Sequence, residues 1–121
     1  MTQVLYTVTA ILPDDATVDA YADWLLDGHI SDVLEASEAS SALVVRLPGR
    51  MIRTQYFFPS QESLDRYIRE RAPALRAEGL RLFGPDRGVQ FQREVGQIVH
   101  EATATRRPEG AGGGQVGRPN R

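Results

Sequence analysis

The feature of the sequence that most constrains the fold is a repeated change in the spacing of its apolar residues. Apolar and polar residues alternate at 3–12, and near Thr17 the spacing becomes that of an amphipathic helix. The two-residue period returns at 41–58, gives way to a second helical pattern after Pro59, and returns a last time at 87–99. Because a two-residue period is typical of strands and a 3.6-residue period of helices, the predicted order is βαββαβ.

This order predicts a particular architecture. Two successive strand-helix-strand units with right-handed crossovers produce a four-stranded antiparallel sheet with two helices on one face. The fold class is therefore α+β, with a ferredoxin-like arrangement. The other face of the sheet is left uncovered, and a second copy of the chain is the simplest cover for a face of this size. We expect a homodimer through that face.

The hairpin between the second and third strands determines which residues lie on the uncovered face. A two-residue loop at Pro48-Gly49 places Leu47 opposite Arg50, and it turns Leu43 and Val45 toward the helices together with Leu47. The opposite face, which we predict to be the dimer face, carries Val44, Arg46, Met51, Arg53, Gln55 and Phe57. Such a mixture of apolar and polar groups is typical of an interface.

Glycine and proline indicate where the two helices are irregular. Gly28 predicts a flaw in the first helix. Ser60 is the expected N-cap of the second helix, and Pro73 predicts a kink or break near 71–73 because proline lacks the donor for a helical hydrogen bond. The second helix is expected to end at Gly79 or Gly84.

Charge and composition divide the chain after Ala102. Residues 1–102 hold ten arginines and fifteen acidic residues, and we interpret them as one ferredoxin-like domain. Residues 103–121 are rich in glycine and arginine and contain no aromatic residue, which predicts a disordered tail. The chain has no lysine and its folded part is acidic, so we expect no nucleic-acid partner.

Other partners and cofactors are also constrained by composition. No apolar stretch approaches the roughly 20 residues of a membrane-spanning helix, so we expect no membrane contact. The absence of cysteine excludes disulfides and thiolate ligands and favours a cytoplasmic protein. The two histidines, His29 and His100, lie on separate predicted elements, and we therefore expect no metal site and no cofactor.

A candidate ligand site comes from polar side chains on otherwise apolar faces. If the apolar faces of the first, third and fourth strands meet the helices, four such side chains point the same way: Tyr6, His29, Tyr56 and Arg93. An imidazole can act as an acid, a base or a ligand near neutral pH, and a buried guanidinium needs an anionic or carbonyl partner. The predicted rim of this pocket consists of Trp24, Tyr67 and Arg71.

Each of these residues also has a purely structural interpretation. His29 fits a hydrogen-bonded core histidine, and Trp24 fits a residue that packs one helix on its surroundings. Arg93 fits a salt bridge at the sheet edge or a place in the dimer interface. The geometry of the groove separates these alternatives from the ligand site.

Several short motifs resemble those of a known family. They are Trp24, His29-Ile30, Gln55-Tyr56, Tyr67-Ile68, Ala72-Pro73-Ala74-Leu75-Arg76 and Arg81-Leu82-Phe83. Over about residues 3–99 the chain resembles a family of small bacterial proteins catalogued as a domain of unknown function, which is similar to the dimeric α/β-barrel group. That group includes cofactor-free monooxygenases, dye-decolourising and haem-degrading relatives, and ligand-sensing domains. The resemblance therefore implies a dimeric barrel fold and no single chemistry.

Three functions are compatible with the sequence. The leading hypothesis is a protein that binds a small anionic or aromatic molecule in the groove between sheet and helices. An alternative is a cofactor-free monooxygenase or isomerase in which His29 or a tyrosine abstracts a proton. The third is a protein-interaction module that uses only the uncovered sheet face. An open pocket that contains His29 would favour the first two.

Overall fold

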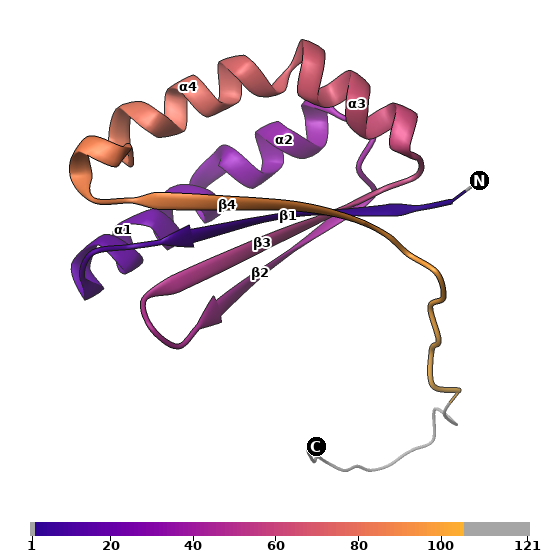
Figure 1. The fold of residues 1–121 in the computed structure, drawn as a ribbon, viewed down its shortest axis with the longest axis horizontal. Helices are drawn as coiled ribbons and strands as arrows, with labels where there is room; N and C mark the ends of the chain where they lie inside the picture. The colour runs from indigo at the N-terminus through magenta and orange to yellow at the C-terminus, as the bar shows by residue number, and fades with distance from the viewer. Residues whose placement is uncertain (1, 106–121) are drawn as a thin grey trace.

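The computed structural model describes residues 2–105, and its elements follow the predicted βαββαβ order. The strands are β1 (Val4–Ile11), β2 (Ser41–Leu47), β3 (Met51–Phe58) and β4 (Gln90–Gln97). The helical segments are α1 (Asp15–Trp24), η1 (Leu25–His29), α2 (Ile30–Ala36), α3 (Gln61–Glu70), α4 (Ala72–Leu82) and η2 (Pro85–Arg87). The strands form one antiparallel sheet in the order β2-β3-β1-β4. Figure 1 shows α2, α3 and α4 over one face of it, so the α+β ferredoxin-like fold is confirmed.

The register of the central strand β1 decides which side chains face the helices. Tyr6 lies opposite Tyr56 on β3 and opposite Val95 on β4. Val8, the next residue on the same face, lies opposite Arg93 of β4. Since side chains two residues apart share a face, a row from each of three strands points toward the helices.

The core lies between this row and the helices, in two neighbouring clusters. One cluster joins the sheet to α2 and α3 and contains the buried residues Val4, Tyr6, Val33, Tyr56, Phe58, Leu64, Tyr67 and Ala72. The other joins the sheet to α1 and to the segment after α4, through Ala10, Leu12, Val18, Tyr21, Leu25, Ile52, Phe83 and Val89. Aromatic residues from strands and helices supply much of the buried surface in both clusters.

The predicted hairpin register is wrong by one residue. Three residues, not two, form the loop, and both Gly49 and Arg50 adopt positive φ, at 84° and 62°. Leu47 therefore lies opposite Met51 rather than Arg50. A one-residue shift moves every side chain of a strand to the other face.

The composition of the uncovered face changes accordingly. Val44 and Arg46, which we had predicted on the dimer face, lie opposite Thr54 and Ile52 on the helix side. Arg46 forms an ion pair of 3.2 Å with Asp19 of α1. The residues that β2 contributes to the uncovered face are Leu43, Val45 and Leu47, while β3 contributes Met51, Arg53, Gln55 and Phe57 as predicted.

The predicted flaw at Gly28 is a turn of π-helix. Gly28 has φ 151° and ψ −26°, and the N–H of Ile30 donates to the carbonyl of Leu25, five residues back. Single π-turns insert an extra residue into a helix and are frequent at functional sites. Here the turn separates α1 from α2 and contains His29.

The second helix begins and breaks as predicted. Ser60 is the N-cap, and its side-chain oxygen accepts a hydrogen bond from the backbone N–H of Ser63. The side-chain oxygen of Ser63 in turn accepts a hydrogen bond from the backbone N–H of Ser60. The helix breaks at Arg71, between α3 and α4. It ends at Leu82, so the predicted end at Gly79 is wrong, and Gly84 lies just beyond the last turn.

The chain after β4 runs away from the sheet (Figure 1). Residues 103–105, the start of the predicted tail, are exposed, and 106–121 lie outside the described residues. None of the helices within 2–105 is long and apolar enough to cross a membrane.

The strained backbone at Gly28 leads to a stability prediction. A Cβ at position 28 would meet no atom within 4 Å, so Gly28→Ala tests backbone strain alone, and we expect it to lower the free energy of unfolding by about 1–3 kcal/mol. Gly96→Ala is the matched control, since a Cβ there also meets open space but φ is ordinary. Its effect should stay within about 1 kcal/mol. Equal stability of the two variants in urea denaturation would contradict the predicted strain.

Candidate functional site

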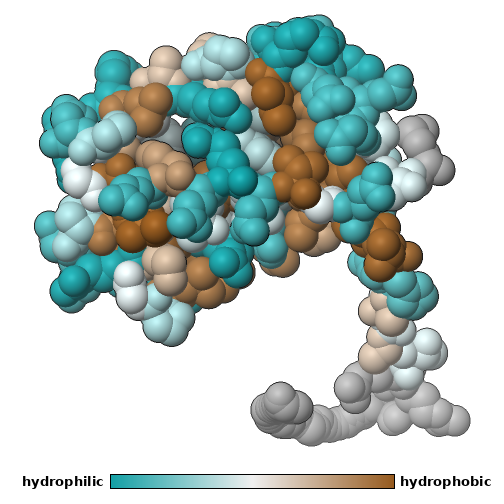
Figure 2. Space-filling model, viewed as in Figure 1, coloured by the Kyte–Doolittle hydropathy of each residue, from teal (hydrophilic) through white to brown (hydrophobic). Residues whose placement is uncertain are grey.

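A cavity of about 60 Å³ lies between the sheet and the helices. Its lining consists of Tyr6, Val8, Tyr21, Trp24, Leu25, His29, Val33, Thr54, Tyr56, Tyr67, Leu75, Arg76, Gly79, Leu80, Phe91 and Arg93. Most of these residues are buried or half-buried, whereas Leu80 of α4 and Arg93 of β4 are exposed and therefore mark the opening. Figure 2 shows the surface hollowed between α4 and β4.

The structure brings the four predicted ligand residues to this one cavity. Tyr6 and Tyr56 lie side by side on neighbouring strands, with ring centroids 6.1 Å apart. His29 reaches the cavity from η1, and Arg93 reaches it from β4. Arg93 is exposed rather than buried, and its guanidinium lies 5.4 Å from the centroid of the Phe91 ring. It thus lies beside the core, at the opening.

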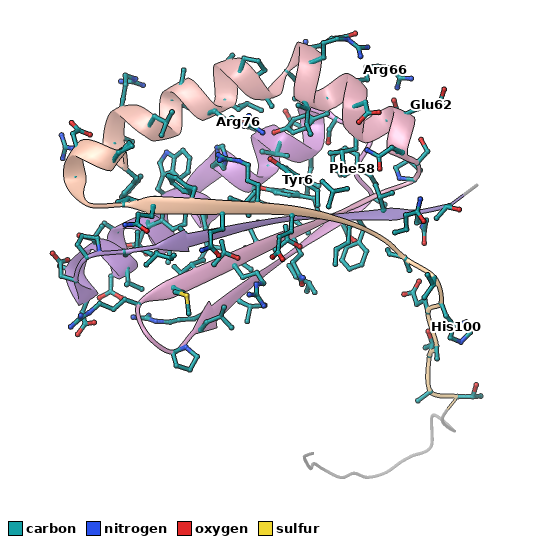
Figure 3. All side chains as sticks on the ribbon, viewed as in Figure 1. Tyr6, Phe58, Glu62, Arg66, Arg76 and His100 are labelled. Atoms are coloured by element: carbon teal, nitrogen blue, oxygen red, sulfur yellow. The ribbon has the colours of Figure 1, made fainter. Side chains whose placement is uncertain are left out.

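Arg76 and Thr54 are polar residues of the site that sequence reasoning missed. Arg76 is the charged one. It extends from α4 toward β1, and its Nη2 donates a hydrogen bond of 3.0 Å to the hydroxyl of Tyr6 (Figure 3). Its side chain is half-buried. The helical spacing did not predict that Arg76 points inward, because its side chain points about 100° away from that of the neighbouring apolar residue Leu75.

His29 has an unsatisfied polar atom in the cavity wall. Its ring stacks on Trp24 with centroids 4.0 Å apart and an interplanar angle of 22°. Its Nδ1 is buried and has no hydrogen-bond partner among the described residues. Burial lowers the pKa of His29, and the carboxylates of Glu78 and Asp32 oppose this effect. At neutral pH the imidazole is therefore uncharged and has a nitrogen available to a ligand.

Three tyrosines of the cavity, Tyr21, Tyr56 and Tyr67, are neutral hydrogen-bonding groups. Burial raises the pKa of Tyr21 and of Tyr67 to about 12, and it raises the pKa of Tyr56 well above its ordinary value. Because a phenol of such high pKa keeps its proton near pH 7, these side chains act as donors or acceptors rather than as bases. Thr54 adds a buried hydroxyl that lacks a partner within residues 2–105.

Two of the three predicted rim residues line the cavity. Tyr67 lies in its wall, and Trp24 is packed against α4, where a Cβ on Gly79 would be 2.9 Å from its Cη2 atom. The prediction for Arg71 is wrong: at the break between α3 and α4 its side chain borders a separate depression, beside Glu35 and Glu70. The break changes the helical phase, so residues on either side of it do not share a face.

His100 lies far from this site, on the segment that leaves the sheet after β4 (Figure 3). Over the described range 2–105, no three histidine, cysteine, aspartate or glutamate side chains gather closely enough to hold a metal ion.

Comparison with known families places the chain. Residues 3–98 match the family described as domain of unknown function (DUF4286). The chain belongs to this family. The match covers all four strands and all the helices, and so includes every residue that lines the cavity. No protein of curated function has a significantly similar sequence.

Solved structures of low sequence identity share the fold. An ethyl tert-butyl ether d (EthD) family protein from Bacillus halodurans C-125 is 15% identical, with a TM-score of 0.62 over 82% of this chain and 100% of that one. A dimeric ferredoxin-like protein from an uncultured marine organism is 13% identical, with a TM-score of 0.58 over 84% and 100%. A protein of unknown function from Nitrosomonas europaea is 13% identical, with a TM-score of 0.59 over 87% and 97%. At these identities the likeness establishes the fold alone.

The lowered pKa of His29 predicts a pH-dependent stability. Because the unfolded chain binds a proton at position 29 more readily than the folded chain, stability is complete above about pH 6.5 and falls as the pH drops from there to the folded pKa. His29→Gln removes this contribution, so the variant should lose less stability than the wild type between pH 7 and pH 5. Thermal unfolding at matched pH values measures the difference. Parallel losses in both proteins would contradict a buried neutral His29.

Proposed function

We propose that this protein binds a small molecule in the cavity between the sheet and the helices. The observation that carries the proposal is a pair of buried polar atoms without a partner within the described chain, His29 Nδ1 and Thr54 Oγ1, which belong to two residues of the cavity lining. A buried polar group without a hydrogen bond costs about 1–3 kcal/mol, and such groups are rare unless a ligand or water satisfies them. Mostly apolar walls with a few polar groups are typical of ligand pockets.

The open cavity also supports binding over the two alternatives. A pure interaction module has no need of a pocket that contains unpartnered polar atoms. A cofactor-free monooxygenase or an isomerase would need a base in the pocket, and with Tyr21, Tyr56 and Tyr67 protonated His29 is a candidate for it. Recovery of a bound compound unchanged, checked by mass spectrometry after incubation, separates a binding protein from such an enzyme.

A ligand screen with a blocked pocket tests the proposal. Val8→Phe places a larger side chain in the cavity wall, and Val44→Phe makes the same change on β2, outside the lining. We expect compounds from a fragment collection to raise the melting temperature of the wild type and of Val44→Phe, and to leave Val8→Phe unchanged. A full absence of shifts, or shifts that persist in Val8→Phe, would contradict ligand binding in this cavity.

The uncovered face of the sheet supports a second proposal, that the chain forms a homodimer. Its apolar residues are Leu5, Ile11, Leu43, Val45, Leu47, Met51 and Phe57. Leu43 and Val45 are 51% and 38% exposed, which is unusual for strand residues of a monomer. The polar groups of the face are partly satisfied within it, since Arg53 Nε donates to Thr9 Oγ1. Two of the proteins of similar fold are described as dimeric ferredoxin-like proteins.

Two neighbouring valines provide a matched test of the dimer. Val44 and Val45 have nearly equal exposure, 36% and 38%, but lie on opposite faces of β2. Val45→Asp should weaken the dimer by roughly 3 kcal/mol or more, over a hundredfold in its dissociation constant, because the charge would be desolvated in the contact. Phe57→Asp should act in the same way, and Val44→Asp should not. Light scattering at micromolar concentration measures this, and a wild-type monomer of 13.4 kDa would refute the dimer.

A further inference from the structure

The cavity collects positive charge in an otherwise acidic domain. Residues 1–102 hold fifteen acidic residues against ten arginines. The cavity lining nevertheless includes Arg76 and Arg93, and no aspartate or glutamate. The local excess of cationic groups is therefore opposite in sign to that of the domain around it.

The two cavity arginines differ from the arginines that form ion pairs. Carboxylates lie within 4.0 Å of Arg46, Arg50, Arg66 and Arg69. Neither Arg76 nor Arg93 has such a carboxylate within residues 2–105. Arg76 donates to the hydroxyl of Tyr6, and Arg93 lies over the Phe91 ring.

A half-buried guanidinium has five donors, and one hydrogen bond to a phenol leaves most of them unused. The planar fork of arginine fits the two oxygens of a carboxylate, which is the group it most often binds in proteins. Arg76 on α4 and Arg93 at the opening thus provide anion-binding groups on two sides of the cavity.

The remaining walls of the cavity combine aromatic rings with aliphatic side chains. Tyr21 and Trp24 contribute rings from α1, and Tyr56 and Phe91 contribute rings from the sheet. Aromatic rings in a cavity wall favour a planar, conjugated ligand over a branched aliphatic one of the same size.

We propose that the cavity binds a small aromatic carboxylate, with its carboxylate at Arg76 and Arg93 and its ring between the aromatic walls. This inference rests on the proposed function and names the chemical class of its ligand. A cavity of about 60 Å³ is smaller than the cavity of about 150 Å³ that accommodates benzene, so only part of a single ring fits inside and the rest of the ring lies in the opening beside Leu80.

The test compares 4-hydroxybenzoate with 4-hydroxybenzamide, which has almost the same shape and no charge. Trp24 is the sole tryptophan of the chain and lies in the cavity wall, so its fluorescence reports binding of either compound. We expect 4-hydroxybenzoate to bind the wild type about tenfold more tightly or better. Arg76→Gln should abolish this preference, and Arg81→Gln, an exposed α4 residue outside the lining, should retain it within about twofold.

The outcomes separate this inference from the proposed function. Equal affinity for acid and amide in the wild type, or a preference for the acid that survives Arg76→Gln, would overturn the anionic class. Neutral fragments that bind the wild type but not Val8→Phe, with no binding of the acid, would retain the pocket and refute the inference. A fragment screen without any hit refutes both. Circular dichroism of Arg76→Gln verifies that the variant is folded.

Discussion

The pairing of β1 along both of its edges is the constraint on which the rest of the structure depends. With β3 on one edge and β4 on the other, the strand cannot shift by one residue without breaking two ladders. That fixed register turns Tyr6 toward the helices, and it brings Tyr56 and Arg93 to the same face from the neighbouring strands. The chemical groups of the cavity are thus held by backbone hydrogen bonds rather than by flexible loops.

Two glycines complete the helical wall above that sheet. Gly79 lacks the Cβ that would strike Trp24, so the indole packs directly on α4. Gly28 adopts a φ that other residues avoid, and the π-turn around it places His29 against the same indole. The stack is therefore built from local backbone irregularities. The buried Nδ1 of His29 has no hydrogen-bond partner in the described chain, and unsatisfied polar atoms of this kind are often retained at functional sites.

The spacing of residues in the sequence predicted the features that depend on a single helix or strand. Alternation along strands identified Tyr6, Tyr56 and Arg93, and the Ser60 cap followed from local chemistry. The predictions that failed concern how one helix or strand is connected to the next. The hairpin register depends on Arg50 at positive φ, which a non-glycine residue rarely adopts. The extra loop residue moves each side chain of β2 to the face opposite the predicted one.

Helix geometry set a similar limit at the cavity. The helix breaks at Arg71, so the apolar stripe predicted through Leu64, Ile68, Leu75 and Leu82 holds only in part: Leu75 lines the cavity, whereas Leu82 is exposed. The inward direction of Arg76 therefore had no counterpart in the pattern. Its hydrogen bond to Tyr6 joins residues 70 positions apart, a relation that only the assembled fold contains.

The sheet is a single layer, and this has an evolutionary consequence. Even-numbered residues of β1 and β3 point toward the helices, where they line the cavity or fill the core, while odd-numbered ones point to the uncovered face. Neighbouring codons in one strand thus experience separate selection, since a change at Thr54 alters only the cavity and a change at Gln55 alters only the other surface. Members of the family can therefore change the residues on one face of the sheet while keeping those on the other.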